Sequence, residues 1–68
     1  PISMNPNAVK IAEIRAAQAV QELYPDLINN FNNYQAQGLN VSDYAATMKQ
    51  KQQEISNYIL SAIGYFNK

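Results

Sequence analysis

The chain contains no cysteine and no histidine, and only two of its 68 residues are glycine. Without cysteine no disulfide can form, and without either residue a zinc site loses its two most common ligand types. The same absences remove the most common nucleophile and the most common acid–base group of enzymes. Two isolated glycines also cannot build a glycine-rich phosphate loop. We therefore expect no enzyme activity, no metal and no cofactor.

The chain also lacks an excess of charge of either sign, because five basic residues balance five acidic ones. A nucleic-acid-binding domain usually carries a basic excess, since neutralising phosphates supplies much of its affinity. Nucleic acid is therefore not the favoured partner. No apolar run approaches the ~20 residues that a membrane-spanning helix needs. No apolar run follows a basic start, as it would in a signal peptide, so we expect a cytoplasmic protein.

The small size of the chain limits its core to that of a single thin domain. A domain of this length buries only about 60% of its unfolded surface, and small domains usually add disulfides, a metal or oligomerisation. Since the first two are excluded, oligomerisation or a protein partner is the expected source of extra stability. Residues 1–3, which precede Met4, read as a cloning remnant, so the expected domain comprises residues 4–68.

The first half of the chain predicts a helix over about 6–24. Asn5 is a suitable N-cap and Pro6 fits the first turn. Apolar residues then recur at steps of three and four on one face: Val9, Ala12, Ala16, Val20 and Leu23. Ile11 and Ile14 lie off this stripe. They belong either to a wide core face or to a second contact surface for another chain.

Proline and glycine divide the remainder into two further helices. Pro25 predicts either a kink or the start of a new helix, over about 25–37. Gly38 suits the left-handed position after a helix, and Ser42 is a good cap for a helix over about 42–66. No strand-like alternation appears. The sequence therefore predicts an all-α fold, a helical hairpin or three-helix arrangement that packs as an oligomeric bundle.

The last helix carries a heptad seam, which is typical of a helix that packs lengthwise on another. We assign the interaction seam to Ala45, Met48, Gln52, Ile55, Ile59, Ala62, Ile63 and Phe66. Gln52 either fixes register as a buried amide or lies at the wet edge of the seam. Residues 58–66 are apolar nearly all round, and such a helix must be covered on every side. A dimer is the simplest way to cover it.

A resemblance offers a second interpretation of the same stretch. Residues 37–39 and 44–58 resemble the helix-turn-helix of phage repressors of the Cro and cI type. In that family an alanine, a hydrophobic residue three positions later, and an Ile or Val in the recognition helix form the core, and Ala45, Met48 and Ile55 match these places. The resemblance implies a DNA-binding regulator whose contacts to DNA would come from Lys51, Gln52, Gln53 and Asn57.

The two interpretations differ at Lys49 and Gln50. The repressor family usually has glycine at the first of these positions and a hydrophobic residue at the second. Lys, Gln and Glu are good helix formers, so local propensity favours a straight helix through residues 48–53.

From the sequence we therefore expect a non-catalytic interaction or assembly module that forms a homo-oligomer, with a dimer as the first expectation. A protein partner is also possible. Two other functions stay open. One is the repressor-like regulator, and the other is an inhibitor or antitoxin-like protein that inserts its apolar C-terminal helix into a partner's groove.

Overall fold

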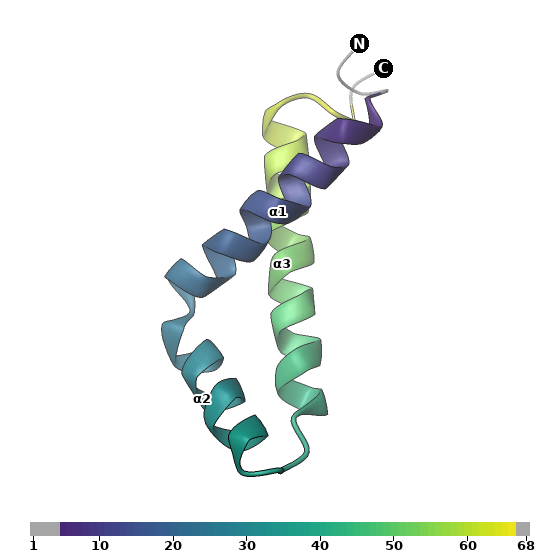
Figure 1. The fold of residues 1–68 in the computed structure, drawn as a ribbon. Coiled ribbons are helices and arrows are strands. Elements are labelled where there is room, and N and C mark those ends of the chain that lie inside the picture. Colours follow the sequence, from purple (N-terminus) through teal and green to yellow (C-terminus); the bar gives the residue numbers. More distant parts are fainter. Residues whose placement is uncertain (1–4, 67–68) are drawn as a thin grey trace.

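The computed structural model describes residues 5–66 and consists of three helices, α1 (Pro6–Leu23), α2 (Pro25–Ala36) and α3 (Ser42–Ala62) (Figure 1). The all-α, three-helix prediction is confirmed. The predicted cloning remnant at residues 1–3 and the start at Met4 lie outside the described residues. In Figure 1, α1 crosses α3 and diverges from it beyond the crossing, and α2 then returns toward the beginning of α3, to which a short loop joins it.

Local signals set the beginnings of the first two helices. The Asn5 side chain accepts a hydrogen bond from the backbone N–H of Asn7 at 3.0 Å, and Pro6 occupies the first turn of α1. Tyr24 interrupts the helical path with φ −127° and ψ 56°, and Pro25 then opens α2. Proline has no N–H to leave unpaired at a helix start. Pro25 is therefore the start of a new helix.

Both glycines end a helix in the same way. Gly38 has φ +74° and Gly64 has φ +78°, a conformation that other residues adopt only with strain. After α2, the N–H of Leu39 donates to the Tyr34 carbonyl at 3.0 Å, and after α3 the N–H of Tyr65 donates to Leu60 at 2.8 Å. These are Schellman motifs. The second ends α3 at Ala62, four residues before the predicted boundary, although the apolar pattern continues.

The start of α3 uses a different residue from the predicted cap. Val41 is the N-cap and makes no side-chain capping bond, while Ser42 is already the first residue of the helix. The Asn40 side chain accepts from the backbone N–H of Ser42 at 2.9 Å and so takes over the capping role. The helix still begins at the predicted position, because Asn40 and Ser42 both favour a helix entry there.

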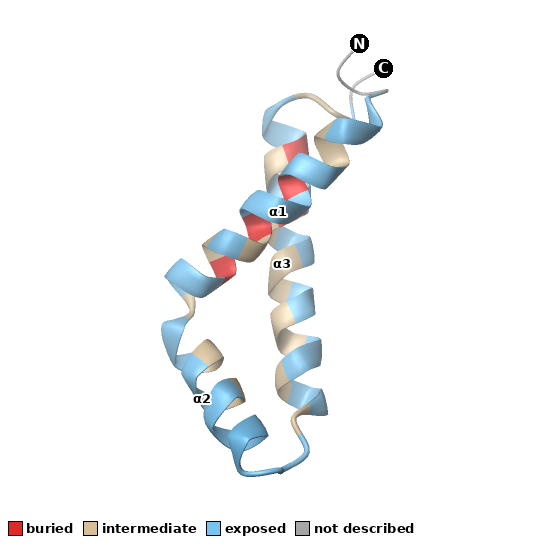
Figure 2. Ribbon diagram, in the orientation of Figure 1, coloured by how far each residue is buried: buried red, intermediate tan, exposed pale blue. Residues whose placement is uncertain are grey.

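The small core lies along one face of α1 and in the second half of α3 (Figure 2). The buried residues there are Ala12, Ala16 and Val20 of α1, with Ser56 and Leu60 of α3. Leu23, expected on the same face, is 65% exposed. From residue 21 to residue 55 no residue is buried. The described chain therefore has one packed half and one open half.

Replacing Gly38 with alanine should lower the free energy of unfolding by about 1 kcal/mol, because a Cβ is strained at positive φ. No atom lies within 4 Å of the place where that Cβ would be, so the loss comes from the backbone alone. Asn tolerates this conformation better, and Gly38→Asn should therefore lose less than Gly38→Ala. Urea denaturation of the two variants at equal concentration measures the difference. Equal losses would argue against a left-handed residue at position 38.

Candidate interaction surface

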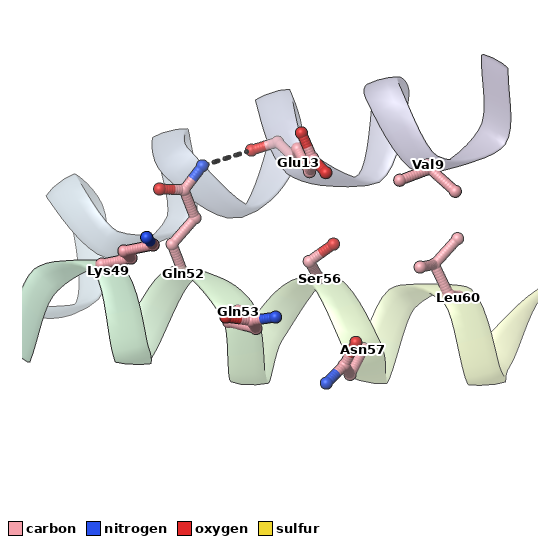
Figure 3. Close-up of a pocket in the computed structure, with 8 residues that line it drawn as sticks. All are labelled: Val9, Glu13, Lys49, Gln52, Gln53, Ser56, Asn57 and Leu60. Carbon is pink, nitrogen blue, oxygen red and sulfur yellow. Dashed lines mark hydrogen bonds between the residues drawn. The ribbon is translucent and has the colours of Figure 1, made fainter. Parts of the chain in front are cut away.

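The crossing of α1 and α3 depends on small side chains. Ala12 and Ala16 are completely buried, and Ser56 is 6% exposed. Figure 3 shows the Ser56 side chain pointing from α3 toward α1. Small side chains at a helix crossing let the two backbones approach closely, so that even alanine methyl groups are removed from water.

Gln52 connects the two helices by a polar contact. Its side-chain amide donates to the backbone carbonyl of Glu13 at 3.1 Å (Figure 3). Among residues 5–66, the other side-chain hydrogen bonds all join residues two or four positions apart. The carbonyl of Glu13 lies within α1, so the amide bonds to one fixed turn of that helix. Gln52 therefore adds a polar contact between α3 and one turn of α1.

The predicted seam residues divide between half-buried and exposed positions. Met48, Gln52, Ile55 and Ile59 are half-buried, while Ala45, Ala62, Ile63 and Phe66 are exposed. The side chains that meet α1 follow a different row, Gln52, Ser56 and Leu60, at steps of four. Rows at this spacing interdigitate when helices cross at an angle, whereas a heptad seam needs helices that run side by side. Ser56 and Leu60 could not be predicted from the sequence as contacts to α1, because the angle at which two helices cross depends on the tertiary structure.

The residues proposed for DNA contact do not share one free face. α3 runs unbroken through residues 48–53, so the turn of the repressor family does not form there. Gln52 is turned toward α1, and the Lys51 ammonium lies over the Tyr24 ring, 5.5 Å from its centroid. Two residues further on, Gln53 is about 200° around the helix axis from Lys51. Gln53 and Asn57 are exposed.

A groove of about 370 Å³ lies beside the crossing (Figure 3). Gln53 and Asn57 line it together with Glu13, Lys49 and Gln52, and Val9 and Leu60 give it an apolar part. Its amides can donate and accept hydrogen bonds but cannot transfer protons near neutral pH. Within residues 5–66 no three carboxylates gather as metal ligands. The groove therefore combines hydrogen-bonding amides with apolar side chains.

An apolar cleft of about 280 Å³ opens where the three helices face one another. We call it the three-helix cleft. Its apolar lining comes from Ala17 and Val20 of α1, Ile28 and Phe31 of α2, and Ala45 and Met48 of α3. The large side chains Ile28, Phe31 and Met48 are only half-buried. Ile28 and Phe31 lie in the helix predicted over about 25–37 but were not predicted to form a site, although the amphipathic pattern of that segment is a signal for them.

Further apolar side chains are exposed outside the cleft. Ile11 is 52% and Ile14 60% exposed, so they do not belong to the core of the single chain. Toward the end of α3, Tyr58 is 73% and Phe66 58% exposed. Single exposed hydrophobic residues are common on protein surfaces, but here they outnumber the buried ones.

Tyr34 and Tyr44 join the end of α2 to the beginning of α3. Their ring centroids are 5.4 Å apart with the planes inclined by 41°, a tilted arrangement that aromatic pairs favour. Burial raises the pKa of Tyr44 above its ordinary value of 10.0, and the neighbouring Tyr34 phenol raises it further. The pair is the main aromatic contact between these two helices in the described chain.

Comparison with protein families, with curated proteins and with solved structures finds no match for this chain. Within residues 5–66, none of the helices combines the length and the hydropathy needed to cross a membrane.

Replacing Gln52 with alanine should lower the free energy of unfolding by about 1 kcal/mol, because the hydrogen bond to the Glu13 carbonyl is lost. Gln53→Ala is the matched control, since Gln53 is exposed and makes no hydrogen bond to α1. It should change stability by less than about 0.5 kcal/mol. Chemical denaturation of both variants checks the prediction. Equal effects would show that Gln52 does not link the helices.

The Tyr44 pKa predicts how stability depends on pH. Because the folded-state pKa lies above the unfolded value of about 10, the neutral phenol is favoured in the folded protein. This contribution is fully present below pH ~10 and is lost as the pH rises through the folded-state pKa. NMR titration of labelled tyrosines should show the Tyr44 pKa falling in Tyr34→Phe and unchanged in Tyr58→Phe. An unchanged value in Tyr34→Phe would contradict the pairing.

Proposed function

We propose that this protein is a non-catalytic interaction module that functions by self-association. The observation that supports this proposal is an excess of exposed apolar side chains. Eight large hydrophobic residues of the described chain are at least 37% exposed, whereas four apolar residues are buried. Apolar surface that a single chain leaves uncovered is typical of an interaction site. A second copy of the chain would cover part of it.

The dimensions of the chain support the same proposal. Its radius of gyration is 14.4 Å and its extents are 47 × 18 × 14 Å. A compact domain of this length has a radius of gyration of about 11 Å. The four buried apolar residues are two alanines, one valine and one leucine. So small a core offsets little of the conformational entropy of ordering sixty or so residues, and contacts between chains would add to the stability of the fold.

The polar surface suits an assembly role rather than a catalytic one. Nine asparagines and seven glutamines provide neutral hydrogen-bonding groups, and the ten charged residues cancel in sign. Two copies of such a surface do not repel one another electrostatically. The chain offers neither histidine nor cysteine for acid–base or nucleophilic chemistry.

Sedimentation equilibrium of the purified chain across nanomolar to millimolar concentrations tests the proposal. We expect a reversible monomer–dimer or higher equilibrium, accompanied by a thermal midpoint that rises with concentration, because association stabilises the folded state by mass action. A single monomeric species with a concentration-independent midpoint throughout this range would contradict self-association.

A further inference from the structure

Helix α2 is joined to its neighbours by two segments that are not helical. At its start, Tyr24 has φ −127° and ψ 56° and makes no side-chain capping bond. The last hydrogen bond of α1 runs from the Tyr24 N–H to the Val20 carbonyl, and the first of α2 runs from the Ile28 N–H to the Tyr24 carbonyl. Pro25 has no N–H with which to extend the hydrogen bonds of α1. At the other end residues 37–41 form a loop, so both junctions can change direction without breaking a backbone hydrogen bond within α1 or α3.

The helix itself has little that keeps it folded. None of its twelve residues is buried, and four of them are asparagines, which are mediocre helix formers. Its large side chains Ile28 and Phe31 are only half-buried against the other helices. An isolated helix of about 12–15 residues or fewer is marginal in water, so its helicity depends on packing. Once detached from α3, α2 would therefore lose its helical structure as well.

Two aromatic contacts fasten the ends of α2 to α3. At the start of α2 the Lys51 ammonium lies 5.5 Å from the centroid of the Tyr24 ring, and near its end the centroids of Tyr34 and Tyr44 are 5.4 Å apart. Both distances are within the range in which a cation and a ring, or two rings, attract one another. Such contacts are weak when they lie at a surface, and Tyr34 is 37% exposed. They hold α2 in place without burying it.

The contacts between α1 and α3 do not involve α2. Of the five buried residues, Val20 lines the three-helix cleft. The other four lie outside the cleft: Ala12, Ala16, Ser56 and Leu60. The hydrogen bond from Gln52 to the Glu13 carbonyl also joins α1 directly to α3. The crossing can therefore stay folded while α2 is detached.

We propose that α2 is a hinged arm that detaches from α3 and unfolds as a unit between Tyr24 and residue 41, while the crossing of α1 and α3 stays folded. The two aromatic contacts hold the arm closed. Opening removes Ile28 and Phe31 from the three-helix cleft and exposes Met48 on its opposite wall. The chain thus contains a conformational switch between a covered and an uncovered apolar lining. This proposal does not depend on self-association.

Native-state hydrogen exchange of the unmodified chain tests the arm directly. The backbone amides of α2 should open at least about tenfold more often than those of Ala12, Ala16 and Ser56, because segments with few buried contacts open at a lower free-energy cost. Low concentrations of urea should accelerate exchange at the crossing much more than in α2, since a local opening exposes less surface than global unfolding. Equal opening frequencies with the same urea dependence would mean one cooperative unit and would overturn the proposal.

Two substitutions outside α2 separate the arm from the crossing. Tyr44→Ala removes the ring that contacts Tyr34, so α2 should open about fivefold more often, the factor that an aromatic pair contributes. Leu60→Val removes one buried methylene at the crossing, which should make the crossing amides open about fivefold more often. Because Leu60 does not line the cleft, the opening of α2 should stay within about twofold in Leu60→Val.

Tyr58→Ala is the matched control for Tyr44→Ala. Tyr58 also lies in α3 but is 73% exposed, so its loss should change the opening of α2 by less than about twofold. An α2 that opens more often in Leu60→Val, by the same factor as the crossing, would show that the two unfold together. Equal effects of Tyr44→Ala and Tyr58→Ala would remove the aromatic contact as the fastening of the arm. If a variant does not fold, the exchange pattern of the unmodified chain decides.

Discussion

The close contact of α1 with α3 is the interaction on which the remaining structure depends. Ala12 and Ala16 allow it because their side chains are short, and both are fully removed from water. Gln52 adds a hydrogen bond from α3 to the Glu13 carbonyl of α1. Short side chains give a well-defined geometry but bury little apolar area, and the hydrophobic contribution scales with that area. The crossing therefore determines shape more than it determines stability.

The position of α2 follows from backbone signals rather than from packing. Pro25 starts the helix immediately after α1 ends, and Gly38 turns the chain back toward α3. Between these two residues, the aromatic pair of Tyr34 and Tyr44 is the main link to α3. A helix placed in this way keeps its apolar face available. The open half of the molecule is thus a direct consequence of where proline and glycine stand.

Sequence reasoning predicted the helices well because their signals are local. The signals at helix ends act within one turn of the residue that carries them. Asn5 caps the start of α1, Pro25 begins α2, and Gly38 takes the positive φ that ends it. Sequence reasoning failed at Gly64, where apolar periodicity continued past a residue that ends the helix. The row through Ser56 and Leu60 depends on a crossing angle, which no local pattern encodes. The three-helix cleft also joins residues from three separate helices, and their meeting depends on tertiary geometry.

The absence of buried residues between positions 21 and 55 has a consequence for the protein in a cell. Segments with few buried contacts open at low free-energy cost, and proteases cleave chains in such open states. Under the proposed association, a second copy stabilises the folded state, so resistance to cleavage increases with the amount of protein present. Molecules that are dissociated at low abundance would be the first to be degraded. The abundance of the protein would then govern its own lifetime.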